Sequence, residues 1–256
     1  MAGNGKARED ASNPSFAEFL SELSTSLLKA NPGVVDSEIR RFIAKIGERY
    51  RVDRVVLRRL DENLAVATAL QSWVSSSEIG LVTEFRIEQA PWIASNLFKH
   101  APTRIDNSSN LPPEALAERE ILNRSKLRAM LVVPIKWDGL LYGAIDLASQ
   151  QDHEWPDEVV SEVALLGEIL VCAHVRAKNI VSLEANESRY RAVVENQTEF
   201  IVRWLPDGTR TWVNDRYCEF FQTPRKQLLG TSFLPLVLQA DRQKILDRIA
   251  AMSPAH

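Results

Sequence analysis

Histidine and cysteine are the side chains of this 256-residue chain that most readily ligate metals or act as nucleophiles. They are spread along the sequence: His100, His153, His174, His256, Cys172 and Cys218. None of these residues shows a His-x-x-x-His or Cys/His ligand spacing, so the sequence predicts no metal site. Two distant cysteines in apolar surroundings also predict no disulfide framework, which fits a reducing compartment and a cytoplasmic protein.

Motifs of phosphate chemistry and of signalling enzymes are absent from the sequence. Neither GxxxxGK[ST] nor GxGxxG occurs, and there is no Gly-Gly-Asp/Glu-Glu-Phe run of a cyclase. His174 falls in a predicted helix, but its context, Cys-Ala-His-Val-Arg-Ala, lacks the acidic neighbour and the downstream proline of a phospho-accepting histidine. We therefore expect His174 to be a helix-surface residue, and the chain not to be an enzyme.

Composition and charge limit the classes of partner. The chain has 31 Lys+Arg against 34 Asp+Glu, a net charge of −3, and 45% hydrophobic residues, as in ordinary globular proteins. This near balance gives no electrostatic reason to expect nucleic acid or an anionic membrane as partner. The basic stretch 49–59 is most simply a solvated sheet edge or helix end. The sequence has no signal-peptide core and no apolar run of about 18 residues, so we expect no membrane span.

Helix and strand periodicities alternate in the first two thirds of the chain. Helical stripes occupy 16–28 and a segment from Asp36 onward. Strand patterns follow at 53–60, 64–73, 129–136 and 140–149, the last two joined by the tight turn Trp137-Asp138-Gly139. Gly143 inside a strand indicates close approach of a neighbouring backbone. Hairpins rather than βαβ crossovers predict an antiparallel α+β domain.

A long helix from Trp155-Pro156-Asp157 carries apolar residues at 4-3-4-3-4-3 spacing. This row comprises Val159, Val163, Leu166, Leu170, Ala173, Ala177 and Ile180. A second apolar row, beginning at Val160, predicts two packing partners for the helix, its own domain and something more. We expect the first row to be the seam of a homodimer; the simpler alternative is a long packing helix. After Ile180 the spacing restarts at Leu183 through a stammer, a local overwinding of a coiled coil.

Five segments follow one another in a characteristic order: Leu111-Pro-Pro-Glu-Ala-Leu-Ala-Glu-Arg-Glu, Leu127-Arg-Ala-Met-Leu-Val-Val-Pro-Ile, Asp138-Gly139, Tyr142-Gly-Ala-Ile-Asp146 and Trp155-Pro-Asp-Glu. Together they resemble a GAF domain, most of all the N-terminal GAF domains of bacterial multi-sensor kinases and cyclases. The resemblance covers about 17–176. It implies a six-stranded antiparallel sheet between helices, with a small-molecule pocket on one face.

Apolar residues in the segments that cap this sheet are candidates for the pocket: Trp73, Phe85, Trp92, Ile93, Leu97 and Met130. Such a lining suits a small apolar or planar ligand, although the same residues are equally typical of ordinary core. The family's ligand variants are not matched. No cysteine lies in the pocket region for bilin attachment or for a methionine sulfoxide reductase, and the cyclic-nucleotide and flavin signatures are missing. We expect no covalent bilin, flavin or metal; the ligand is unknown.

The C-terminal part contains four further segments: Glu187-Ser-Arg-Tyr-Arg-Ala-Val-Val-Glu-Asn, Phe200-Ile-Val-Arg-Trp-Leu-Pro-Asp-Gly-Thr, Trp212-Val-Asn-Asp-Arg-Tyr-Cys and Leu229-Gly230. They resemble the N-terminal half of a PAS domain. The resemblance implies that the last three strands are missing, and an isolated hairpin is marginal in water. We expect a poorly packed segment and a chain that is part of a longer receptor.

The domain organisation expected from these patterns is a flexible tail (1–15), a GAF domain (16–176), a signalling linker helix (177–197) and an incomplete PAS-like segment (198–256). Its expected function is a non-catalytic sensory and dimerisation module of bacterial signal transduction. One alternative is the input region of a histidine kinase or diguanylate cyclase whose catalytic domain lies beyond this chain. Another is a free-standing regulator whose PAS-like part is completed by a partner protein.

Overall fold

The computed structural model describes residues 14–195 and 197–251. The chain divides into two compact units, and the boundary between them falls after Ile180. Most of the tail predicted at 1–15 lies outside the described residues. Ser15 is the N-cap of the first helix. Its hydroxyl accepts a hydrogen bond from the Glu18 N–H, and the Glu18 carboxylate accepts one from the Ser15 N–H at 2.8 Å. This capping box explains why the helix starts at Phe16.

The first unit is built on a six-stranded antiparallel sheet with the order β3-β2-β1-β6-β5-β4. Its strands are β1 (Arg54–Leu60), β2 (Val66–Val74), β3 (Glu84–Arg86), β4 (Thr103–Ile105), β5 (Ala129–Trp137) and β6 (Leu140–Ser149). The α+β class and the six-stranded sheet between helices are therefore confirmed.

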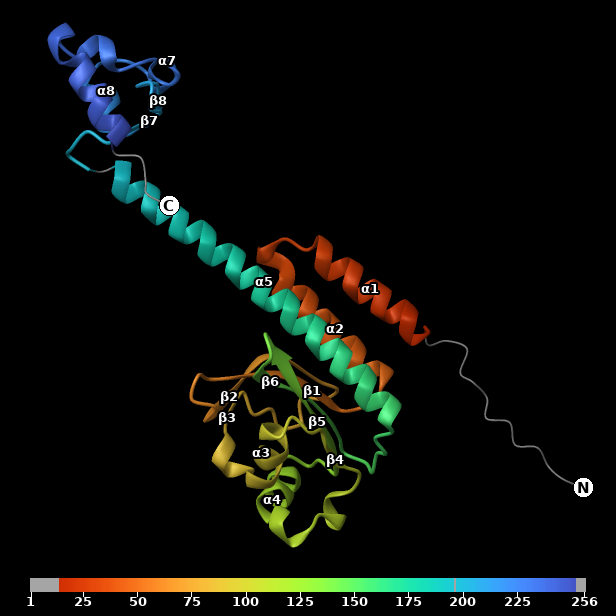
Figure 1. Cartoon of the computed structure of the whole chain (residues 1–256). Coiled ribbons are helices and arrows are strands. Elements are labelled where there is room, and N and C mark those ends of the chain that lie inside the picture. The colour runs from red at the N-terminus through yellow and green to blue at the C-terminus, as the bar shows by residue number, and fades with distance from the viewer. Residues whose placement is uncertain (1–13, 196, 252–256) are drawn as a thin grey trace, which may run out of the picture. The chain divides into compact units, whose positions relative to one another are not determined.

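Helices cover both faces of this sheet (Figure 1). One face packs against α2 (Val35–Arg49) and the first part of α5 (Asp157–Glu195), and α1 (Phe16–Lys29) packs on α2 in the same core; the other face is covered by α3 (Pro91–Phe98) and α4 (Leu116–Arg124). Alternation along the strands separates two cores, since Ile145 and Leu147 belong to the α1–α2–α5 side and Ala144 to the other. Short 3₁₀ turns complete the unit at Pro32–Val34, Ile87–Gln89, Ser108–Asn110 and Pro113–Ala115.

The predicted dimer seam on α5 lies mostly inside the core of its own domain. Val163, Leu166, Leu170, Ala173 and Ala177 are buried there, Val159 packs against the same core, and Ile180 is 37% exposed. The second row is also buried at Val160 and Val171. The assignment of the first row to a dimer interface was wrong in this part of the helix, because such spacing marks any packed helix face and does not identify the partner.

The second unit contains the hairpin of β7 (Val202–Trp204) and β8 (Arg210–Val213) and a small buried core of Val213, Tyr217 and Leu228. Its other elements are α6 (Asp215–Phe220), α7 (Arg225–Leu228), α8 (Arg242–Ala251) and 3₁₀ turns at Leu234–Leu236 and Gln239–Asp241. Asn214 joins hairpin and helix, because its side-chain oxygen accepts from both the Ile201 and the Tyr217 N–H. Within the described ranges, no helix has the length and apolar character that a bilayer crossing requires.

Gly143 lets β1 and β6 approach closely, as its position in the strand predicts. A Cβ atom at this position would lie 2.0 Å from the carbonyl oxygen of Arg58. Because that neighbour is backbone, it cannot move without disturbing the ladder between the two strands. Gly143 therefore fixes the part of β1 that carries Arg58.

We predict that Gly143→Ala lowers the free energy of unfolding by about 1–3 kcal/mol, since overpacking forces backbone shifts. Gly33→Ala is the matched control, because nothing lies within 4 Å of a Cβ there; its effect should stay within about 0.5 kcal/mol. Urea unfolding measures both. Equal stability of the two variants would contradict this account of the sheet.

Candidate functional site

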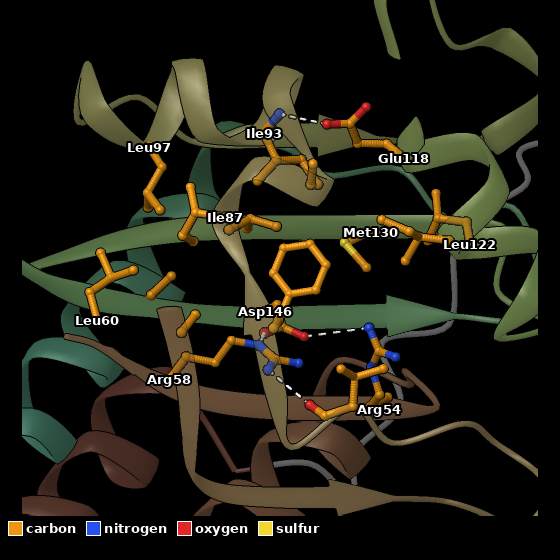
Figure 2. A pocket seen from close by; sticks show the side chains of 17 residues that line it. Arg54, Arg58, Leu60, Ile87, Ile93, Leu97, Glu118, Leu122, Met130 and Asp146 are labelled. Atoms are coloured by element: carbon orange, nitrogen blue, oxygen red, sulfur yellow. Dashed lines mark hydrogen bonds and ion pairs between the residues drawn. The ribbon is translucent and has the colours of Figure 1, made fainter. Parts of the chain in front are cut away.

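A cavity of about 770 Å³, counting its opening to solvent, lies between the sheet and α3–α4. Figure 2 shows its lining, which strands of the sheet supply from one side and α3 and α4 from the other. Most of the lining is apolar: Leu60, Ala67, Val82, Phe85, Ile87, Ala90, Ile93, Leu97, Ile121, Leu122, Met130, Val132 and Ala144. The remaining four residues are charged: Arg54, Arg58, Glu118 and Asp146.

Four of the six residues predicted for a pocket line this cavity, namely Phe85, Ile93, Leu97 and Met130. Trp92 packs in the core on the same side of the sheet without lining the cavity. Trp73 lies on the opposite face, because it pairs with Val55 across β1 and β2. Its ring occupies the space beside Gly47 of α2, where a Cβ atom would lie 2.1 Å from it.

Arg54, Arg58 and Asp146 form a buried ion cluster on the sheet side of the cavity, which we call the arginine wall. Arg58 Nε donates to Asp146 Oδ1 at 2.7 Å, and Arg54 Nη2 lies 3.5 Å from Asp146 Oδ2 (Figure 2). The latter contact is a charge contact only, since Oδ2 has no hydrogen-bond partner within the described ranges. Burial lowers the pKa of the Arg54 guanidinium, which the Asp146 carboxylate partly offsets.

The sequence-based assignment of the basic stretch to a solvated edge was wrong for these two arginines. β1 is an interior strand between β2 and β6, and the Arg54 and Arg58 side chains are 4% and 12% exposed. Backbone carbonyls of the segment after β2 hold them in place: Arg54 Nη1 donates to Gly80 O at 3.1 Å and Arg58 Nη1 to Val82 O at 2.9 Å. One feature of the sequence could have indicated this burial: Asp146 is a carboxylate inside an otherwise apolar strand and needs a cationic partner.

Glu118 joins the two helices that cover the cavity. This residue of α4 is 1% exposed, and its Oε1 accepts from the Trp92 N–H at 2.8 Å and the Ile93 N–H at 3.1 Å. These are first-turn donors of α3, whose own N-cap residue, Ala90, provides no side-chain acceptor. Glu118 Oε2 has no hydrogen-bond partner in 14–195 or 197–251. Sequence reasoning missed this residue, although Pro91 after an alanine marks a helix start that needs an external acceptor.

The family model for the GAF domain matches residues 35–173, which is more than half of the chain, on the part that builds this sheet and cavity. The chain belongs to the GAF domain family. A model for the PAS fold matches 188–256, so the expected order of GAF and then PAS is confirmed. Both are sensory domains that generally have regulatory roles.

Solved structures with the same fold have diverged far in sequence. A phycocyanobilin-bound GAF domain from a cyanobacterial phytochrome is 12% identical with a TM-score of 0.54, covering 63% of this chain and 95% of that one. The GAF domain of an Acinetobacter phosphoenolpyruvate-protein phosphotransferase is 13% identical (TM-score 0.51; 66% and 99% covered). Free methionine-R-sulfoxide reductase from Neisseria meningitidis, in complex with its substrate, is 14% identical (0.52; 70% and 98%). No curated protein matches the chain.

No histidine or cysteine among the described residues of the GAF domain lines the cavity. Cys172 is an exposed residue of α5 and Cys218 belongs to α6. His174 is 7% exposed, and its Nδ1 lies 3.2 Å from Asp36 Oδ1, so its assignment to the helix surface was wrong. Among the described residues, no three His, Cys, Asp or Glu side chains are grouped as a metal site requires.

We predict that Asp146→Ala destabilises the GAF domain by about 3–5 kcal/mol, because it leaves two buried guanidinium groups without their carboxylate. The matched control is Asp152→Ala, which breaks an exposed ion pair with Arg128 and an exposed hydrogen bond from Asn107 and should cost less than about 1 kcal/mol. Urea unfolding followed by circular dichroism gives both values. If the two variants lost equal stability, the arginine wall would not be a desolvated cluster.

Proposed function

We propose that this chain is a non-catalytic sensory module of bacterial signal transduction, in which binding at the GAF cavity alters helix α5. Through α5 the change would reach the PAS segment, and from there a downstream output domain or a partner protein. The two thiols without metal ligands support a reducing compartment, which we propose is the cytoplasm. The observation that carries the proposal is that the same strands line the cavity on one face and contact α5 on the other.

Strand β6 connects the cavity directly to the helix. Ala144 and Asp146 line the cavity, while Ile145, between them, lies in the core shared with α5. On the helix, a Cβ atom added at Gly167 would lie 2.7 Å from the Ile135 side chain and 3.1 Å from that of Ile145. Because helix and sheet are in such close contact, a displacement of β6 by a ligand has to move α5.

The second part of α5 supports dimerisation through a different set of residues from the row predicted first. Apolar side chains are exposed there at Val181 (53%), Leu183 (69%), Tyr190 (74%) and Val193 (55%). A helix of this length is marginal in water without a packing partner, and the restarted spacing at Leu183 and Tyr190 suits a second copy of the same helix. We propose a parallel homodimer through this part of α5.

We predict that the protein sediments as a dimer at tens of micromolar, and that Leu183→Glu combined with Tyr190→Glu raises the dissociation constant at least about tenfold, since like charges would meet in the seam. Leu28→Glu is the control, because Leu28 is an equally exposed leucine (71%) on α1. Analytical ultracentrifugation distinguishes the variants. A monomeric wild-type protein would remove the basis of the dimer proposal.

The coupling itself can be tested without knowing the ligand, by filling the cavity from β6. Ala144→Leu adds volume inside the cavity, at a cost of about 1–3 kcal/mol for overpacking. We predict that amide hydrogen exchange in residues 163–177 of α5 rises by about fivefold or more, and exceeds the rise in α2. The control is Ala65→Leu, at an exposed position before β2. Unchanged exchange in α5 would show that the sheet does not transmit the displacement.

A further inference from the structure

The positive and negative charges that line the cavity do not cancel on each side of it. The arginine wall contains two cations and one anion, and therefore carries one excess positive charge. The fourth residue, Glu118, belongs to α4 on the other side of the cavity. Within the described ranges no ion pair links Glu118 to Arg54 or Arg58. The excess charge is thus next to an apolar space.

The charge of Glu118 is already stabilised locally. Its carboxylate accepts two backbone N–H groups at the start of α3, where the helix dipole also favours a negative charge. Glu118 is therefore not needed as a counter-ion for the arginines, and it does not act as one. Burial of an uncompensated charge is costly, so the arginine wall is prepared for an additional anion.

Arg58 is the member of the arginine wall best placed to receive such an anion. Its side chain is 12% exposed, against 4% for Arg54 and 5% for Asp146. Its Nε and Nη1 atoms donate to Asp146 and to Val82 O, whereas no hydrogen bond of its Nη2 is present in the described part of the chain. A planar guanidinium with a spare donor matches the geometry of a carboxylate.

The remainder of the cavity sets the other half of the ligand. Ile93 and Leu97 of α3 line the cavity from the side opposite the arginine wall, and Phe85 and Met130 add apolar surface from the sheet. Such a surface binds a compact hydrocarbon or aromatic body and gains little from polar substituents. An extended polyanion would leave charges facing these side chains, so a single anionic group is favoured.

We propose that the cavity binds a small monocarboxylate with an apolar, preferably aromatic, body, and that the ligand carboxylate pairs with Arg58. This inference rests on the proposed function of the cavity as the sensory site. It adds the chemical class of the ligand, and it assigns Arg58 as the residue that determines specificity for an anion.

Two isosteric probes test the proposal: 2-naphthoate, and its neutral analogue 2-naphthamide. Isothermal titration calorimetry on the full chain should show 2-naphthoate binding about tenfold more tightly than the amide. In Arg58→Gln that ratio should fall to about one, whereas Arg58→Lys should keep part of it. Arg59→Gln is the matched control, because Arg59 is the exposed neighbour on the same strand, and its ratio should equal that of the wild type.

Asp146→Asn provides a test in the opposite direction. It removes the carboxylate that competes with the ligand for Arg58 while keeping an acceptor oxygen, so the preference for 2-naphthoate should increase. Equal or tighter binding of the amide to the wild type would overturn the proposal and indicate selection by the acceptors of Glu118 or Asp146. Absence of binding by both probes would also overturn it. The sedimentation and hydrogen-exchange experiments above need no ligand, so the sensory function stands or fails separately.

Discussion

The ion pair between Arg58 of β1 and Asp146 of β6 is the interaction on which the first unit depends most. Both strands are interior members of the sheet, and both faces of that sheet are covered by helices. The Arg58 and Asp146 side chains are therefore largely shielded from bulk water, at 12% and 5% exposed, and each charge needs a partner across the ladder. Because Val56 pairs with Asp146 and Arg58 with Ala144, the Arg58 and Asp146 side chains lie on the same face as diagonal neighbours, two residues apart in the register. That face is the one that bears the cavity.

Close approach of backbones supports this arrangement from the other side. Gly143 leaves room for the carbonyl of Arg58, and Gly167 leaves room for the Ile135 and Ile145 side chains below α5. Gly143 thus allows β1 and β6 to approach closely, and Gly167 allows α5 to approach the sheet. The two faces therefore differ: one has a cavity that can hold a small molecule, whereas the other packs closely against α5 at Gly167.

Much of this fold could be predicted from local sequence. The turn Trp137-Asp138-Gly139, the exceptional Gly143 and the ordered GAF and PAS motifs identified the architecture, and four of six proposed lining residues reached the cavity. The predictions that failed share a cause. The spacing of apolar residues shows which face of a helix or strand is buried, but it does not show what that face packs against. The row from Val163 to Ala177 packs in the core of its own domain. Trp73 pairs with Val55 and therefore lies on the face of the sheet opposite the cavity. The interior position of β1, which buries Arg54 and Arg58, is a property of strand order that no local pattern contains. The second unit, expected to be poorly packed, combines a small core with exposed Phe220 and Leu238.

The start of α3 shows how one buried carboxylate ties together two distant parts of the chain. Ala90 gives this helix no cap, and Glu118, 28 positions later, serves in its place. The two helices over the cavity are therefore linked directly to each other by this carboxylate. For protein engineering this makes positions 90 and 118 an exchangeable pair: a serine or aspartate introduced at 90 would take over the capping, and 118 would become free to be redesigned for new guests.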